Sequence, residues 1–424
     1  MSPPVSKSES DRLPTVEPDL RVTTPPRYPS VKVVTRRPKA TGPAARITAR
    51  VRDGALGIRQ FDLVLLAAAV ALSLTGAVLV WSATRTKLLS AGDDPDLFLT
   101  KHLLNVVIGI ALGLVVTRLD YRTIRSHTPL IYVVSVVALL AVLSPLGSSV
   151  NGAQAWLVLP AGFTIQPGEI AKITVVLVMA NVLADRDLGT ERPTATDFRR
   201  ALALTAAPIV LIMLEPDLGT VLVIVSVAVG VLAVAGVRLR WLGALCAGGA
   251  GLALLAVVFG LLGQYQLDRL STFLDPGRDP LGTGYNTGQA RIAIGAGGFF
   301  GSGLFGGHQT QGAFVPYQQT DFIFSVAGEE LGFFGGVAII LLLGVVVWRG
   351  CVIARMAGDM YGRIVASGVV LWFSFQAFEN IGMNLGIMPV TGVPLPFVSY
   401  GGSSMFVAWI GVGLLQSVYM RSRA

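Results

Sequence analysis

The stretch FDLVLLAAAVALSLTGAVLVW, Phe61–Trp81, decides the fold class. A helix needs about 20 predominantly apolar residues to cross a lipid bilayer, and this run supplies them. A second run of similar length, LGALCAGGAGLALLAVVFGLL, occupies Leu242–Leu262. Both runs therefore predict helices that span a membrane.

The composition of the whole chain agrees with a membrane location. Of its 424 residues, 53% are hydrophobic and only 14% are charged, whereas a soluble domain carries roughly 25% charged residues. The net charge of +8 does not indicate nucleic-acid binding, because the basic residues lie between apolar runs and in the N-terminal tail. The two cysteines, Cys246 and Cys351, lack the spacing of a zinc or redox site, and we interpret them as packing residues.

Ten apolar segments follow Arg59, so we predict an all-α polytopic membrane protein with ten transmembrane helices. The segments are 61–81, 103–117, 129–146, 170–184, 201–214, 218–235, 242–262, 322–348, 364–386 and 405–419. The connection between the seventh and eighth, residues 263–321, is longer than an ordinary loop and rich in glycine and aromatic residues. We therefore expect this large outer loop to be functional.

The positions of Lys and Arg predict the orientation in the membrane. Arginines precede the first segment and follow the second, fourth, sixth, eighth and tenth, whereas the third, fifth and ninth loops contain no Lys or Arg. Cytoplasmic loops carry the excess of basic residues. Both termini are therefore expected in the cytoplasm, with the odd-numbered loops outside a cytoplasmic (plasma) membrane.

The N-terminal residues 1–59 differ from the rest. They are rich in Pro, Ser, Thr and Arg and show no apolar periodicity, so they cannot bury enough apolar surface to fold alone. We predict a disordered basic cytoplasmic tail over 1–59 and a membrane domain over 60–424.

On this topology several ionisable residues collect at the outer face. Glu169 and Lys172 open the fourth segment, and their i, i+3 spacing puts them on one side of the helix. Asp217 precedes the sixth segment and Asp321 precedes the eighth. Carboxylates are also favoured at helix N-termini as caps, so Asp217 is equally explained by capping, and Asp321 less well because Thr320 is as good a cap.

Three further acids, Glu329, Glu330 and Glu379, fall within predicted spans. Ionisable groups at this depth are costly and mark either a polar pathway or a paired structural network, and both interpretations stay open. The three histidines, His102, His127 and His308, show no metal-ligand spacing.

Six ordered motifs resemble the SEDS family of cell-wall polymerases, the RodA/FtsW group, over about residues 60–420. The motifs are NGAQAW at 151–156, QPGEIAK at 166–172, PDLGT at 216–220, DP at 275–276 with DPLGTGY at 279–285, TDFIF at 320–324 with EELG at 329–332, and PVTGVPLPFVSYGGSS at 389–404. The wording of the last motif resembles the elongation branch, RodA, more than the division branch, FtsW.

The resemblance implies a glycosyltransferase that polymerises lipid II, a disaccharide-pentapeptide on undecaprenyl diphosphate, for cell elongation and shape. It also implies a class B penicillin-binding protein as partner, within the elongation or division machinery. The family's catalytic aspartate matches Asp321, and its required Glu and Lys match Glu169 and Lys172. Two positions depart from the family: Ala155 stands where many relatives carry Arg, and Glu215, where many carry Gln, adds a negative charge beside the presumed site.

The chemistry requires a carboxylate base for the attacking sugar hydroxyl, which Asp321 fits, with inversion at the anomeric carbon. The departing diphosphate requires a cation, either a divalent ion such as Mg²⁺ or Mn²⁺ or a basic side chain. The outer-face candidates are Lys172, Arg269, Arg278 and Arg291. Other residues expected to bind substrate are Trp156, Gln166, Asp217, Thr320 and Ser399.

The alternative functions are a lipid II flippase, with Glu329, Glu330 and Glu379 as a proton relay, and a scaffold that only recruits a synthase.

Overall fold

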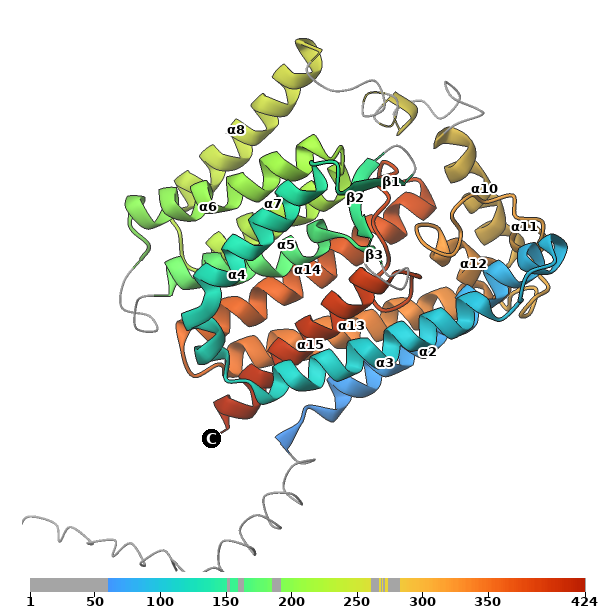
Figure 1. Ribbon diagram of the computed structural model, residues 1–424, viewed down its shortest axis with the longest axis horizontal. Helices are drawn as coiled ribbons and strands as arrows, with labels where there is room; N and C mark the ends of the chain where they lie inside the picture. Colours follow the sequence, from blue (N-terminus) through green and yellow to red (C-terminus); the bar gives the residue numbers. More distant parts are fainter. Residues whose placement is uncertain are drawn as a thin grey trace, which may run out of the picture. The chain divides into compact units, whose positions relative to one another are not determined.

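The fold is a bundle of long helices. The computed structural model describes residues 60–150, 153–158, 164–184, 192–260, 267, 269, 271–273 and 283–423, so the predicted tail 1–59 lies outside it. The helices in chain order (Figure 1) are α2 (Leu63–Ala91), α3 (Leu97–Arg118), α4 (Tyr121–Val142), α5 (Pro167–Leu183), α6 (Ala195–Leu214), α7 (Leu218–Val234), α8 (Leu239–Val258), α10 (Thr283–Ala296), α11 (His308–Gln311), α12 (Ile323–Glu330), α13 (Gly332–Met356), α14 (Met360–Leu385) and α15 (Gly402–Ser422).

Every predicted apolar segment overlaps one of these helices. Within the described part of the chain, seven helices are long and apolar enough to cross a membrane, namely α2, α3, α4, α8, α13, α14 and α15. α7 is apolar but shorter. The chain is thus a multi-pass membrane protein, and the count of ten spans stays a prediction.

The helix starts follow from local capping. Asp62 caps α2 by accepting the Leu65 amide at 3.0 Å. The Asp62 carboxylate also forms an ion pair with Arg349 of α13, and its backbone N–H donates to Gln416 Oε1 of α15 at 2.9 Å. These contacts hold α2, α13 and α15 together at one end of the bundle.

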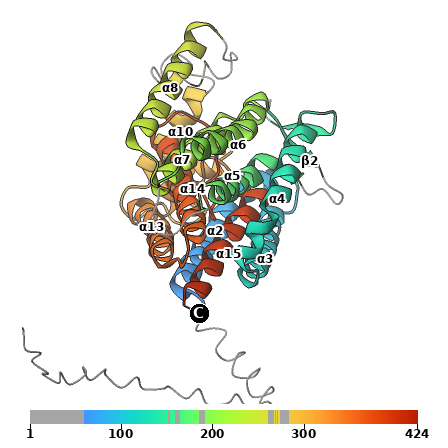
Figure 2. The same cartoon turned by 90° about the vertical axis from the view of Figure 1, so that its left-hand side faces the viewer.

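α3 and α15 approach closely because small residues face each other. A Cβ added to Gly113 of α3 would lie 2.7 Å from the Trp409 carbonyl oxygen, and one added to Gly413 of α15 would lie 2.5 Å from the Gly113 carbonyl oxygen. Small residues let membrane helices pack backbone to backbone. By contrast, α8 extends away from the bundle in both views (Figures 1 and 2), with only 6% of its apolar window buried.

The prediction of one continuous eighth helix over 322–348 is wrong. α12 ends at Glu330, and the chain restarts as α13 with Gly332 at φ 68°, in the left-handed region that suits glycine. Backbone of the outer loop enters this break: Ser302 N–H donates to the Glu329 carbonyl at 2.9 Å, and Phe333 N–H donates to the Gly298 carbonyl at 2.8 Å. The break therefore joins the outer loop to the bundle.

The all-α prediction also missed a small antiparallel sheet in the loop after α4. Its strands, in the order β1-β2-β3, are β1 (Gly147–Val150), β2 (Ala153–Val158) and β3 (Thr164–Ile165). Strands this short display too little alternation to distinguish them from a loop. Gln154 Nε2 ties β2 to the end of α4 by donating to the Val142 and Ser144 carbonyls, each at 3.0 Å.

Two further expectations differ from the structure. The described part of the predicted outer loop contains the helices α10 and α11, which hydropathy did not indicate. Cys246 and Cys351 are free and exposed, so their interpretation as packing residues is wrong. Both lie on helices whose outward faces are apolar, where a cysteine behaves as a small hydrophobic side chain.

Candidate active site

A cavity of about 370 Å³ opens where the starts of α5, α7 and α15 meet. Segments far apart in the chain contribute to its wall. The lining residues are Phe98, Ala155, Trp156, Gln166, Pro216, Asp217, Arg269, Tyr317, Gln319, Thr320, Asp321, Thr391, Gly392, Pro394, Tyr400, Gly401, Ser403 and Ser404. Six of the residues proposed from the sequence are among them: Trp156, Gln166, Asp217, Arg269, Thr320 and Asp321.

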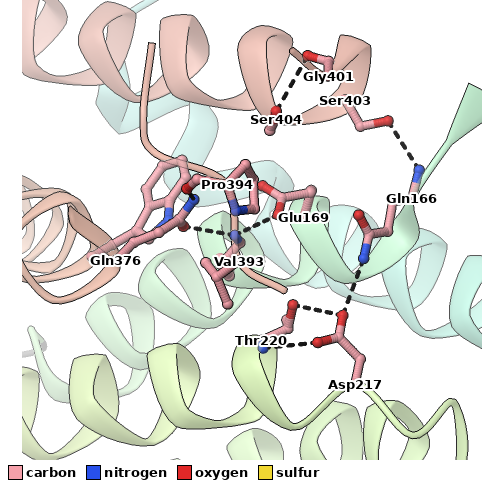
Figure 3. Close-up of polar contacts among 12 residues, drawn as sticks. Gln166, Glu169, Asp217, Thr220, Gln376, Val393, Pro394, Gly401, Ser403 and Ser404 are labelled. Carbon is pink, nitrogen blue, oxygen red and sulfur yellow. Dashed lines mark hydrogen bonds and ion pairs between the residues drawn. The ribbon is translucent and has the colours of Figure 1, made fainter. Parts of the chain in front are cut away.

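Asp217 caps α7 and also lines the cavity, so the capping interpretation is confirmed and the substrate-binding one stays a prediction. Its carboxylate accepts the backbone N–H of Thr220 at 3.0 Å and the Thr220 hydroxyl at 2.8 Å. Gln166 Nε2 donates to Asp217 Oδ2 at 3.0 Å, and Gln166 N–H donates to Ser403 Oγ at 3.0 Å (Figure 3). These bonds connect the N-terminal ends of α5, α7 and α15 across one wall of the cavity.

The carboxyl group of Asp321 lines the same cavity and has a raised pKa. The pKa of Asp321 is raised to about 6, chiefly by burial and to a smaller extent by the negative charge of Asp217, while a Thr320 hydrogen bond and the Arg269 cation oppose the rise. The side chain does not cap α12, whose first turn has Phe322 at the capping position. A carboxylate with a pKa near neutrality is a stronger base than an ordinary aspartate and is still mostly ionised at pH 7.

The backbone carbonyl groups of Thr320 and Asp321 accept hydrogen bonds from side chains that do not line the cavity. Asn380 Nδ2 and Asn384 Nδ2 of α14 both donate to the Asp321 carbonyl, at 2.8 and 3.1 Å. Ser399 Oγ donates to the Thr320 carbonyl at 2.5 Å. Ser399 is therefore outside the set of cavity residues and contacts the backbone of Thr320, which belongs to it; the expected contact of Ser399 with substrate stays a prediction.

Glu169 and Lys172 form a buried ion pair. Lys172 Nζ donates to Glu169 Oε1 at 2.7 Å and to Gln376 Oε1 of α14 at 2.8 Å, and it lies 5.6 Å from the ring centre of Trp372. Neither charged side chain is more than 2% exposed. Both lie outside the set of cavity residues, although Gln376 Nε2 donates to the carbonyl of the wall residue Pro394 at 2.8 Å.

A second, smaller cavity of about 60 Å³ adjoins the first and contains Arg291. Arg269 lines both cavities, whereas Arg291 lines only the smaller one. The fourth candidate cation, Arg278, lies outside the described residues, as do Asn151, Gly152 and most of the motif at 275–285.

The deep acids Glu329 and Glu330 are engaged in structural bonds. Glu329 accepts the backbone N–H groups of Gln309 and Thr310 at 2.7 and 2.8 Å, and Glu330 accepts the Ser82 hydroxyl at 2.6 Å and the Phe305 N–H at 3.1 Å. The carboxylates thus anchor the outer loop, which favours the structural network over a proton relay. Glu379 is buried elsewhere, on α14 near Lys172.

The predicted extra negative charge at Glu215 is wrong. The side chain is 1% exposed, and burial together with the neighbouring Asp217 raises the pKa of Glu215 to about 8. The carboxyl group is therefore mostly protonated at pH 7. Sequence alone could not show this, because the cause is burial in the turn between α6 and α7.

Several wall residues were not predicted, among them Gln319, Thr391, Tyr400, Ser403 and Ser404. Four lie within the last family-like motif, whose Gly-Gly-Ser-Ser run opens α15. Small and hydroxylated residues at a helix start were the available signal. Among the described residues, no three His, Cys, Asp or Glu side chains converge as metal ligands, so the divalent ion stays a prediction.

Comparison with known proteins identifies relatives along nearly the whole membrane domain. Residues 62–424 match the model of the FtsW/RodA/SpoVE family, described as cell cycle proteins. The chain is 37% identical to stage V sporulation protein E of Bacillus subtilis over 371 residues, covering 85% of this chain and 98% of the relative. It is 36% identical to the peptidoglycan glycosyltransferase MrdB of Escherichia coli, covering 85% and 94%.

Other matches agree in name and in structure. A probable peptidoglycan glycosyltransferase FtsW of Trichlorobacter lovleyi is 36% identical, with 85% of this chain and 93% of the relative covered. The fold matches a chain of a peptidoglycan synthase complex, described as coordinating polymerization and crosslinking, with a TM-score of 0.71 and 31% identity over 85% of this chain and 98% of that one. It also matches rod shape determining protein RodA of Thermus thermophilus, with a TM-score of 0.62 and 29% identity over 85% and 96%.

Proposed function

Because this chain belongs to the FtsW/RodA/SpoVE family, we propose that it is a peptidoglycan glycosyltransferase that polymerises lipid II into glycan strands at the outer face of the cytoplasmic membrane. The observation that carries the proposal is the cavity in which Asp321, with its raised pKa, lies beside the Arg269 cation. Relatives named as peptidoglycan glycosyltransferases, FtsW and MrdB, support the reaction class.

In the proposed reaction, Asp321 accepts the proton of the acceptor's 4-hydroxyl group as that oxygen attacks the anomeric carbon of the donor sugar. The new O4–C1 bond forms as the bond from C1 to the diphosphate oxygen breaks, and the lipid diphosphate leaves with both bonding electrons. A single displacement of this kind inverts the configuration at C1. The raised pKa of Asp321 matches the requirement for a base near neutral pH.

The cation for the leaving diphosphate has two candidates. Arg269 lines the cavity, and a guanidinium group binds phosphate oxygens in a bidentate manner. Lys172 is buried behind the wall in its pair with Glu169. We therefore assign the direct contact to Arg269, and propose that Glu169 and Lys172 act on the site through Gln376 and Pro394.

The orientation follows from the alternation of basic loops: both termini face the cytoplasm, and the cavity faces outward. A cysteine introduced at the exposed Gly288 of α10 tests it. We expect a membrane-impermeant thiol reagent to label this cysteine in intact cells or spheroplasts. Labelling only after permeabilisation would move the chemistry to the cytoplasm.

We propose a class B penicillin-binding protein as the partner that crosslinks the product, supported by the match to a synthase complex that coordinates polymerization and crosslinking. The sequence GVPLP at residues 392–396 favours a role in elongation and cell shape. Relatives named for division and sporulation make those the competing roles.

The decisive experiment supplies purified protein with lipid II, with and without its partner, and separates the products by length on a gel. We expect Asp321→Asn and Asp321→Ala to be folded and inactive. The matched control is Asp93→Asn, an exposed aspartate outside the cavity. Normal-length glycan from the Asp321 variants would refute the base assignment, and lipid II translocation without polymerisation by the wild type would indicate the flippase.

A further inference from the structure

A second large cavity, of about 850 Å³, lies at the other end of the bundle from the candidate active site. It is formed by the turn between α7 and α8, the start of α14 and the segment before α6. The active-site cavity lies at the start of α7, and α7 runs for 17 residues, which is about 25 Å of helix. The two cavities are therefore separated by nearly the thickness of the hydrocarbon core.

Four arginines from three separate segments line this cavity: Arg192, Arg238, Arg240 and Arg363. No acidic residue is among the described residues that line it. Within the described part of the chain, none of the four guanidinium groups has an ion-pair partner, and Arg238 stacks on Trp241 at 5.4 Å. Positive charge thus converges here, with no acidic counter-charge in the cavity wall among the residues that the structure describes.

The rest of the wall is apolar and continues onto a surface that faces lipid. Val234, Val237 and Met360 line the cavity beside the arginines. Leu239, which also lines it, is 84% exposed and begins α8, a helix with almost no buried face. A ligand that fills this space therefore meets both the arginines and the start of α8.

We propose that this cavity binds the headgroup of an acidic phospholipid from the leaflet on the basic side of the membrane, with the acyl chains lying along α8. Basic cavities between membrane helices are suited to phosphate headgroups, and the volume is within the range of small-molecule sites. The exposed apolar Leu239 in the cavity wall favours a lipid over a soluble phosphate as the ligand. The proposal is independent of the glycosyltransferase activity proposed above.

Lipid binding by the purified full-length protein in neutral detergent tests the proposal, with native mass spectrometry and the thermal unfolding midpoint as readouts. The probes are phosphatidylglycerol, phosphatidylcholine and soluble glycerol phosphate. The site variant is Arg240→Gln with Arg363→Gln. The matched control is Arg118→Gln with Arg355→Gln, two exposed arginines in the last turns of α3 and α13, outside the cavity.

We expect phosphatidylglycerol to bind and stabilise the wild type in preference to phosphatidylcholine. The site variant should bind phosphatidylglycerol at least tenfold more weakly, a change of about 1.4 kcal/mol or more, because it lacks two of the four arginines that line the cavity. The control variant should bind as the wild type does. Equal losses in both variants, or equal binding of soluble glycerol phosphate, would overturn the proposal.

Discussion

Helices α5 and α8 are both apolar segments, but their surroundings are opposite. In α5, 14 of 17 residues are buried, including the charged Glu169 and Lys172. In α8, which has 20 residues, Leu242 is the only buried one. Hydropathy predicted a membrane span for each and could not distinguish them.

The comparison shows where the buried polar side chains of this protein lie. α5 packs against α14, and the facing side chains of the two helices form a buried polar layer, defined here as Glu169, Lys172, Gln376, Asn380 and Asn384. This layer supports the cavity wall through Pro394 and Asp321. α8 contributes nothing to it, so substitutions on the two sides should have different consequences.

The largest effect is expected from Lys172→Met, which leaves the buried Glu169 carboxylate without its cation. Removing one partner of a buried pair costs about 3–5 kcal/mol, measurable as a lower thermal unfolding midpoint in detergent and as lost polymerisation. Removing both charges, in Glu169→Gln with Lys172→Met, should be less harmful to stability. Equal destabilisation by the single and double variants would show that the unpaired Glu169 carboxylate is not the cause of the lost stability.

Asn380→Ala should reduce polymerisation about tenfold to a hundredfold while the protein still folds. Asn380 Nδ2 donates to the carbonyls of Asp321 and Val393 at 2.8 and 2.7 Å. Asn384 still donates to the Asp321 carbonyl in the variant, so the Val393 carbonyl is the buried acceptor that loses its donor, at a cost of about 1–3 kcal/mol. If Asn380 positions Asp321, kcat falls more than KM rises. A variant with unchanged kcat would leave Asn380 only a structural role.

Gly368→Leu tests the close contact of α14 with α5. A Cβ at Gly368 would lie 2.5 Å from Val176 Cγ1, and overpacking of this kind typically costs about 1–3 kcal/mol. The unfolding midpoint should fall accordingly. An unchanged midpoint would mean that the two helices separate easily, contrary to the buried layer.

The pH dependence of polymerisation follows from the raised pKa of Asp321, which burial places at about 6. The base must be deprotonated, so kcat/KM should rise with pH up to about 6 and level off above it. Below that point each pH unit should cost about tenfold. A profile with its lower inflection near 3.8, the ordinary pKa of an aspartate side chain, would contradict the raised pKa of Asp321.

Gly249→Leu on α8 should have the smallest effect, because nothing lies within 4 Å of an added Cβ. Leucine also has a higher helix propensity than glycine, by up to about 1 kcal/mol. The unfolding midpoint should be unchanged or slightly higher. A clear loss of stability would mean that α8 packs against a surface absent from the described residues.

The helices of the membrane domain were predictable because hydropathy reports directly on burial in lipid, whereas the orientation inferred from the basic loops stays a prediction. The family motifs led to Asp217 and Asp321, which do meet in one cavity. They did not show that Lys172 lies behind the wall, since spacing along α5 gives the face of a helix but not what covers it.

Other features depended on contacts between distant segments. The break at Leu331 depends on the insertion of residues 297–303, and the role of Asn384 depends on the position of the Asp321 carbonyl across 63 residues of sequence. The protonation of Glu215 depends on burial. None of these is encoded in a local pattern.

The joint between the outer loop and the break after α12 has a consequence for which residues can be substituted. It is made by backbone N–H and C=O groups, which every residue except proline presents, but its glycines are constrained. Gly301 and Gly332 combine left-handed conformations with no room for a side chain, Gly297 has no room for one, and Gly298 and Gly303 are left-handed. The neighbouring Phe299, Phe300 and Phe333 are exposed. Their side chains can therefore change without altering the backbone bonds that hold the loop to the bundle.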